Sequence, residues 1–167
     1  FAGHSMGGYV CLAFAKKYPQ RVSGLGLVAS QAAADTPEKK AGRYQTADGV
    51  SQKGVGLVAE GMTSTLSADS AVQAFVRPLM ERQTPAAVTG ALKAMAERED
   101  TLSSLSTAPF PVTLIHGDKD VLIPIERALE IKAALPSARL VALKGIGHMP
   151  MMEAPSETAN GIRLLFE

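Results

Sequence analysis

One serine of this chain has the neighbours that a nucleophile requires. Gly3-His4-Ser5-Met6-Gly7 fits the pattern G-x-S-x-G, in which the serine stands on a strained turn between a strand and a helix. Its flanking glycines leave room for a backbone that would otherwise clash. The following helix would direct free N–H groups and its positive dipole end at negative charge forming on an attacked carbonyl. The pattern therefore predicts nucleophilic chemistry at Ser5, although a glycine-serine turn before a helix gives the same five letters.

A base and an acid for Ser5 follow later in the chain. A serine hydroxyl is a poor nucleophile at neutral pH and needs a base, and the base needs an acid that orients it. Residues 112–117 are typical of a short buried strand, and Asp118 and Asp120 follow on the next loop. Residues 140–143 are typical of another strand, and the loop after it ends at His148. The order of serine, acid and histidine is that of an α/β-hydrolase triad.

The chain resembles the C-terminal two-thirds of the α/β-hydrolase-fold serine esterases. The resemblance rests on three segments: Gly3-His4-Ser5-Met6-Gly7-Gly8, His116-Gly117-Asp118-Lys119-Asp120, and Gly145-Ile146-Gly147-His148 with Glu153-Ala154-Pro155 beyond it. It implies that Ser5 is the nucleophile, His148 the general base and Asp120 the acid, with the Met6 N–H as an oxyanion donor. It also implies a mostly parallel sheet flanked by helices, with a helical cap inserted.

Two aspartates compete for the role of the acid. In the family pattern the acid stands three residues after the glycine that ends the strand, which selects Asp120, and this choice rests on the pattern alone. Asp118 is then interpreted as a turn-capping residue, because aspartate readily bonds its own backbone two residues on. His116 ends a buried strand and His4 fills the variable position of the serine motif, so both are expected to be packed or rim histidines.

Composition favours a soluble enzyme without a cofactor. The chain has 17 Lys and Arg against 16 Asp and Glu, which gives no electrostatic case for nucleic acid or an anionic membrane. No apolar run approaches the roughly 18 residues of a membrane helix. The single cysteine, Cys11, cannot form an internal disulfide and suits a cytoplasmic location. No cysteine or histidine cluster has metal-ligand spacing and no glycine loop is typical of phosphate binding, so neither metal nor cofactor is expected.

Three segments are expected along the chain: hydrolase core over residues 1–30, helical cap over residues 31–107 and hydrolase core again over residues 108–167. In the first segment, residues 6–18 predict a helix with Met6, Tyr9, Val10, Ala13 and Phe14 on one face, and residues 22–28 predict a buried strand. The middle segment has apolar residues at helical spacing over 71–81 and 85–97. In the last segment, residues 125–135 predict a helix, and residues 156–166 predict one with Ala159, Ile162, Leu165 and Phe166 as its buried stripe.

Cleavage of a small-molecule carboxylic ester through an acyl-enzyme is the favoured function. The same triad could serve a perhydrolase, lactonase, thioesterase or carbon–carbon bond hydrolase, and a truncated fold could bind a ligand or partner without catalysis. An aspartate nucleophile is disfavoured because the motif holds serine. The family has four strands before its serine motif, whereas this chain has two residues there. We therefore expect an unpaired sheet edge at residues 22–28, completed by self-association or by an N-terminal segment.

Overall fold

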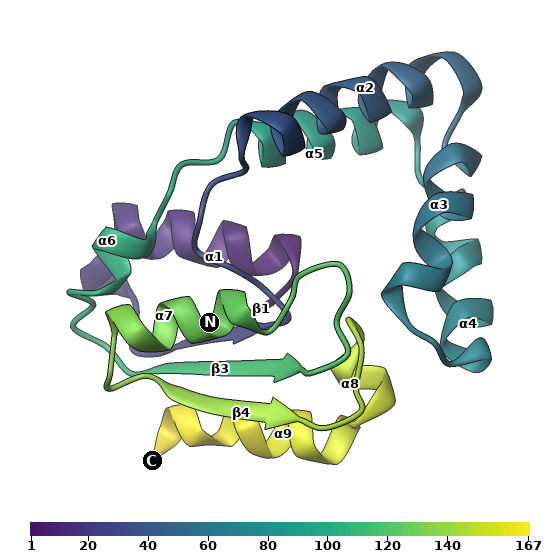
Figure 1. Ribbon diagram of the computed structural model, residues 1–167. Helices are drawn as coiled ribbons and strands as arrows, with labels where there is room; N and C mark the ends of the chain where they lie inside the picture. Colours follow the sequence, from purple (N-terminus) through teal and green to yellow (C-terminus); the bar gives the residue numbers. More distant parts are fainter. The chain divides into compact units, whose positions relative to one another are not determined.

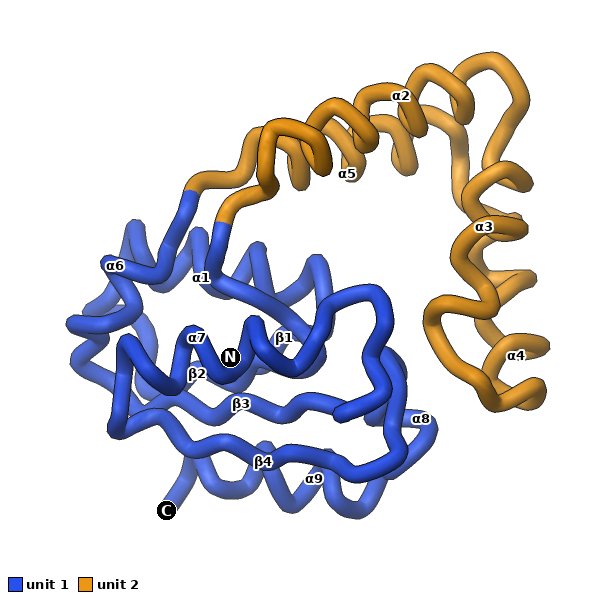
Figure 2. Tube along the Cα trace, in the orientation of Figure 1, with its two compact units in different colours: residues 1–33, 100–167 blue, residues 34–99 orange.

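The computed structural model describes all 167 residues, which divide into two compact units. Residues 1–33 and 100–167 form the sheet unit, and residues 34–99 form the helical unit (Figure 2). The chain thus leaves the sheet unit once and returns to it.

The sheet unit is built on four parallel strands. They are β1 (Ala2–His4), β2 (Leu25–Val28), β3 (Val112–Gly117) and β4 (Arg139–Leu143), in the order β1-β2-β3-β4 (Figure 1). The predicted mostly parallel sheet is confirmed. Because all the strands run the same way, the loops after β1, β3 and β4 leave from one edge of the sheet, where ligands of open α/β sheets bind.

The predicted free edge is wrong in its position. Residues 22–28 were expected to be unpaired on one side, but β2 lies between two neighbours, with Leu27 paired to Gly3 on β1 and to Leu114 on β3. The strand also begins only at Leu25. Three residues of β1 are enough to cover β2, so the edge strand on that side of the sheet is β1.

Helices cover both faces of the sheet (Figure 1). One face carries α1 (Met6–Lys17), α6 (Leu102–Leu105) and α7 (Glu126–Ala134), and the other carries α8 (Pro150–Glu153) and α9 (Pro155–Arg163). Two short 3₁₀ turns follow α1 and α9, at Pro19–Arg21 and Leu164–Phe166. Buried side chains form one cluster on each face, the larger around Leu12, Leu114 and Ile131 and the smaller around Ile115 and Leu143.

Helix α1 packs with a face other than the predicted apolar one. Its buried positions are Gly8, Leu12 and Ala15, whereas Val10 is 64% exposed and Phe14 is 37% exposed. The helix begins directly after β1, so the start point of the helix decides which positions meet the sheet. The hydrophobicity of the side chains alone therefore predicted the wrong face of α1 as the one that packs on the sheet.

The predicted stripe of the last helix is partly wrong as well. Ile162 and Leu165 are partly buried, but Ala159 is exposed and Phe166 is 85% exposed. Gly161 lies close to the sheet, since a Cβ atom there would come within 2.8 Å of the Ile115 side chain. Helix α9 therefore packs on the sheet at Gly161 and Ile162, and Ala159 and Phe166 stay exposed.

The helical unit contains four helices. They are α2 (Pro37–Lys53), α3 (Gly56–Leu66), α4 (Ser70–Glu81) and α5 (Pro85–Ala96). Side chains cap three of them, with Thr36, Asp69 and Thr84 each accepting a backbone N–H of the first turn. The helices predicted over 71–81 and 85–97 are confirmed. Whether this unit acts as a cap over the serine stays a prediction.

The helical unit is shorter than the segment 31–107 expected from the sequence. Ala32 is 3% exposed within the core of the sheet unit, and its carbonyl accepts hydrogen bonds from the N–H and the Oγ1 hydroxyl of Thr101, both at 3.0 Å. Leu105 of α6 is buried in the same core. These contacts bind both connecting segments to the sheet unit.

A buried ion cluster joins the two ends of the helical unit. Asp35, with a fully buried side chain, binds Arg43 of α2 and also Arg98 after α5, the latter at 2.9 Å. Burial alone would raise the pKa of Asp35, but the hydrogen bonds and charges of the two arginines hold that pKa below its ordinary value. The carboxylate therefore stays ionised and ties α2 to the segment after α5.

Candidate active site

Ser5 stands on a strained turn between β1 and α1. Its φ of 51° is rare for a residue with a side chain. Three hydrogen bonds hold this backbone: Ser5 N–H donates to the Val28 carbonyl at 2.9 Å, and the Ser5 carbonyl accepts from Gly8 N–H and from the Ser30 hydroxyl, each at 2.9 Å. Ser30 is 2% exposed and was not predicted from the sequence. The turn expected from the motif is thus present and fixed from β2.

The glycines around Ser5 are crowded unequally. A Cβ atom at Gly3 would come within 2.4 Å of the Gly7 backbone, and one at Gly8 within 2.3 Å of the Ser30 Oγ atom. A Cβ atom at Gly7 would meet nothing within 4 Å. The prediction that a side chain would clash next to Ser5 is therefore confirmed at Gly3, which precedes Ser5. After Ser5, the position where a side chain would clash is Gly8 and not Gly7.

The three predicted site residues meet at the carboxyl edge of the sheet. His148 lies after β4, and its Nε2 atom is 2.9 Å from the Ser5 hydroxyl oxygen. Its Nδ1 atom is 2.7 Å from Oδ2 of Asp120, which lies after β3. A carboxylate can only accept, so Nδ1 carries the proton and the Nε2 lone pair faces Ser5. His148 is 1% exposed and Asp120 is 5% exposed, which screens this contact from water.

The structure brings Asp120, not Asp118, to the histidine. The Oδ1 atom of Asp120 accepts the N–H groups of Leu122 and Ile123, both at 2.9 Å, which leaves Oδ2 for His148. Burial would raise the pKa of Asp120, but hydrogen bonds from His116, His148 and the Ile123 N–H hold it well below its ordinary value. The carboxylate is therefore ionised at neutral pH.

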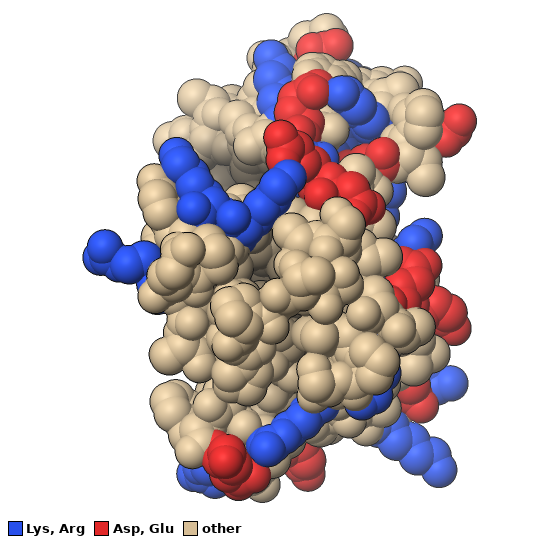
Figure 3. Space-filling view, turned by 90° about the vertical axis from the view of Figure 1, so that its left-hand side faces the viewer, with Lys and Arg blue, Asp and Glu red and all other residues tan.

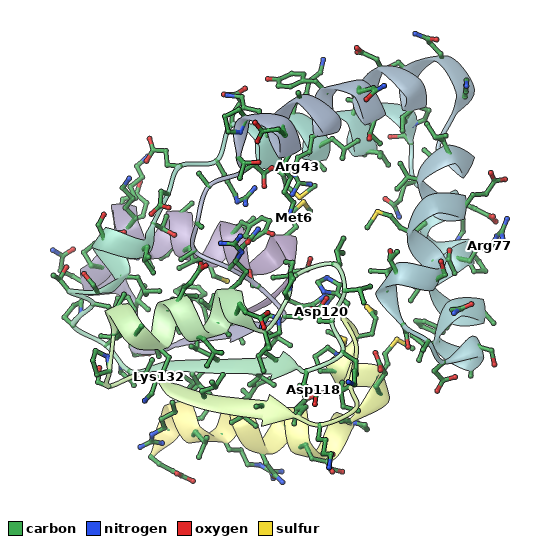
Figure 4. All side chains as sticks on the ribbon, in the orientation of Figure 1. Met6, Arg43, Arg77, Asp118, Asp120 and Lys132 are labelled. Carbon is green, nitrogen blue, oxygen red and sulfur yellow. The ribbon has the colours of Figure 1, made fainter.

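Asp118 has a different place on the same loop (Figure 4). Its side chain is exposed, and its Oδ1 atom accepts the Gly145 N–H at 2.6 Å. Asp118 was interpreted as a residue that caps its own turn, whereas the bond runs to the loop that carries His148. It ties the two loops together without contacting the histidine ring.

Two further residues support this arrangement and had no assigned role in the sequence. His116 is 1% exposed, and its Nε2 atom lies 2.7 Å from the Ile123 carbonyl and 3.4 Å from Oδ2 of Asp120. Glu153 accepts the Gly147 N–H at 2.8 Å and the Met149 N–H at 3.1 Å, so its carboxylate holds the backbone on both sides of His148. His116 was expected to be a packed histidine. Its contact with Asp120 could not be predicted from the sequence, because it depends on how the two residues lie in space.

Met6 is the first residue of α1 and lies at the same edge of the sheet (Figure 4). The first N–H groups of a helix have no partner within the helix. The Met6 N–H and the positive helix end are therefore available for an anion beside Ser5.

No cluster of three histidine, cysteine, aspartate or glutamate side chains could hold a metal ion. None of the helices combines the length and the apolar character that crossing a membrane requires. Figure 3 shows basic and acidic side chains of both signs on the molecular surface.

Solved structures share this fold. An esterase from Thermogutta terrifontis, crystallised with malate, has a TM-score of 0.92 and 33% identity over 99% of this chain and 63% of that chain. A hydrolase from Pseudomonas aeruginosa PA01, at 23% identity, has a TM-score of 0.88 and supports the fold alone. This chain therefore has the α/β-hydrolase fold, with Ser5 on the turn between β1 and α1.

The chain belongs to the family described as serine aminopeptidase, S33, whose model matches residues 1–155. Over 94% of its length it is 29% identical to a pimeloyl-[acyl-carrier protein] methyl ester esterase of Aromatoleum aromaticum, of which it spans 69%. Over 95% of its length it is 26% identical to Lipase 3 of a Moraxella species, of which it spans 52%. The chain thus spans between about half and about two thirds of these relatives.

Proposed function

We propose that this protein hydrolyses carboxylic esters through an acyl-enzyme on Ser5. The observation that carries the proposal is the continuous hydrogen-bonded path from the Ser5 hydroxyl to His148 at 2.9 Å and from His148 to Asp120 at 2.7 Å. This is the geometry in which imidazole accepts a serine proton while a buried carboxylate fixes its tautomer and stabilises the imidazolium.

The reaction follows from the positions of these groups. Ser5 Oγ attacks the ester carbonyl carbon and passes its proton to Nε2 of His148, and the oxyanion forms beside the Met6 N–H. The tetrahedral intermediate then collapses: the carbon–oxygen bond to the alcohol breaks, and the imidazolium of His148 protonates the departing alkoxide. Water next attacks the acyl-enzyme with His148 as the base, which releases the carboxylic acid and restores Ser5.

The names of the relatives favour esters over other bonds. One relative is named a methyl ester esterase and another a lipase. Lactones, thioesters, peracids and carbon–carbon bonds require the same nucleophile and base, so a substrate panel that includes short and long acyl esters ranks these classes.

The lone cysteine also suits a reducing compartment, and we place the activity in the cytoplasm on that ground.

Labelling with a fluorophosphonate tests the nucleophile directly. Intact-mass analysis is expected to find one adduct on the purified protein, which Ser5→Ala abolishes together with hydrolysis of a p-nitrophenyl ester. Ser103→Ala is the matched control, because Ser103 is an exposed serine on α6 of the same unit. An adduct on another serine, or ester hydrolysis without any adduct, would refute the assignment, and a protein with neither would support a binding role.

We propose further that additional polypeptide, from a second copy or from an N-terminal segment, pairs with the free edge of β1. Exposed aromatic rings lie beside that edge: the centroid of the Phe14 ring is 4.9 Å from that of Phe1 and 5.2 Å from that of Tyr18, with the ring planes tilted by 58° and 52°. An unpaired strand next to exposed apolar side chains is a site for strand addition. Sedimentation of the purified 167-residue chain at several concentrations, paired with an esterase assay, tests the pairing. A fully active monomer of this chain at all concentrations would contradict it.

A further inference from the structure

His4 links the strand that carries the nucleophile to the loop that carries the base. It is the last residue of β1, paired with Val28 of β2, and Ser5 is the next residue in the chain. Its Nε2 atom lies 2.7 Å from the backbone carbonyl oxygen of His148, and the two imidazole rings lie 4.9 Å apart between centroids with 52° between their planes. One rigid strand end thus fixes both the serine and a contact with the histidine.

The chemistry of the contact defines the state of the His4 ring. A carbonyl oxygen only accepts, so the Nε2 atom of His4 must carry a proton. Burial lowers the pKa of His4, and the charge of His148 lowers it further, against opposing contributions from the backbone hydrogen bond and from Asp120. The ring is therefore neutral at neutral pH and has one donor, which points at the backbone of His148.

The other bonds of this loop fix it relative to different parts of the sheet unit. From the end of β3, Asp118 binds the Gly145 N–H and the Lys119 N–H binds the Ile146 carbonyl, and from α8 Glu153 binds Gly147 and Met149. These contacts hold the histidine loop relative to the acid and to the helix that follows. None of them sets the distance from His148 to β1, which must stay near 2.9 Å between Nε2 and the Ser5 hydroxyl for proton transfer.

We propose that His4 is a positioning residue that holds the backbone of His148 at hydrogen-bonding distance from Ser5 through its Nε2–H donor. The inference rests on the proposed function, since it concerns the same site. A misplacement of about 1 Å between reacting groups costs on the order of 100-fold in rate. Loss of the His4 donor is therefore expected to lower kcat about 10- to 100-fold and to leave KM nearly unchanged, because the His4 ring acts on the proton-transfer step.

A matched pair of variants separates donation from ring packing. His4→Phe keeps a ring of similar shape without a donor, and His4→Gln keeps an N–H donor near the Nε2 position without a ring. The proposal predicts the loss of kcat in His4→Phe and a kcat within about threefold of the parent in His4→Gln. Equal kcat values in the two variants, or a loss only in His4→Gln, would overturn it. Thermal melts establish that both variants are folded.

Two measurements keep this test separate from the proposed function. If the parent protein forms the fluorophosphonate adduct on Ser5 and the two His4 variants behave alike, the positioning role fails and the hydrolase stands. If the parent forms no adduct, the hydrolase assignment fails, and ¹⁵N-histidine spectra at neutral pH still test His4. They are expected to show a neutral Nε2–H ring whose signals disappear in His4→Gln, and a neutral Nδ1–H ring or a charged ring would contradict the inference.

Discussion

Replacement of Asp120 by asparagine should reverse the tautomer of His148 while leaving the loop folded. Asparagine can keep its carbonyl oxygen on the N–H groups of Leu122 and Ile123, which now bind Oδ1 at 2.9 Å each. Its NH₂ group then faces Nδ1 of His148, where the carboxylate now accepts at 2.7 Å. A donor in that position favours the ring form that has its proton on Nε2, and such a ring cannot accept the proton of Ser5.

The size of the loss follows from that reversal. In serine-protease triads the same exchange lowers kcat by about 10⁴, which corresponds to about 5.5 kcal/mol of transition-state stabilisation. We expect a loss of this order here, because the Asp120 side chain is fully buried and water is poorly placed to replace its carboxylate. KM should change little, since the carboxylate contacts His148 and not the substrate.

Asp118→Asn is the matched control for this prediction. It makes the same chemical change on the same loop, and an asparagine oxygen can still accept the Gly145 N–H that now lies 2.6 Å from Asp118 Oδ1. Its kcat for a p-nitrophenyl ester should stay within about threefold of the parent. Comparable losses in both variants would show a general effect of the loop, and a larger loss in Asp118→Asn would move the acid to that position.

Two further predictions concern stability. Gly8→Ala should destabilise the sheet unit by about 1–3 kcal/mol, as overpacking does, because its Cβ would meet Ser30 at 2.3 Å. Gly7→Ala should be tolerated, because its Cβ would meet nothing within 4 Å. Urea unfolding measures the stability of both variants, and equal losses would contradict the crowding argument. Asp35→Ala should cost about 3–5 kcal/mol, because it removes the buried carboxylate that both Arg43 and Arg98 bind. Hydrogen exchange in α2 and α5 reports that loss, and Glu81→Ala, which breaks an exposed pair with Arg77, should change little.

The free energy of unfolding should depend on pH more strongly in the parent than in Asp120→Asn at acidic pH. The pKa of Asp120 is lowered in the folded protein, so its contribution to stability is complete above the ordinary aspartate pKa of about 3.9 and is lost as pH falls toward the folded value. The free energy of unfolding of the parent should therefore fall more between pH 5 and pH 3 than that of the variant. Parallel curves for the two proteins would contradict the lowered pKa.

The sequence was sufficient where function imposes a local pattern. The serine motif, the acid after one strand and the histidine after another predicted which residues meet, because parallel strands bring their carboxyl ends to one edge whatever the chain length between them. Ser5 and His148 are separated by 143 positions and still meet at 2.9 Å. Apolar runs also predicted the strands, because a parallel strand that is buried on both faces has a continuous apolar sequence.

The sequence was insufficient where contact depends on the tertiary structure. Nothing in the order of residues indicates that Ser30 binds the carbonyl of Ser5, or that Val10 of α1 faces away from the sheet. Both facts depend on how α1 and the segment after β2 are placed around Ser5. Likewise, Gly7 belongs to the motif but has open space around it, whereas its neighbour Gly8 is the crowded position.

The supporting contacts explain why a site with three distant residues can be held to hydrogen-bonding distances. Each of the three has its own anchor: the Ser30 hydroxyl for Ser5, two backbone N–H groups for Asp120, and the Glu153 carboxylate on both sides of His148. The anchors of Asp120 and His148 lie within their own loops and do not fix the distance to the next loop, whereas Ser30 holds Ser5 from the segment after β2. The acid and histidine loops are joined by the Gly145 N–H on Asp118 and by the Lys119 N–H on the Ile146 carbonyl at 2.9 Å, and His4 joins β1 to the His148 carbonyl. Loss of a crossing bond should therefore lower catalysis more than stability, whereas loss of a local anchor should lower both.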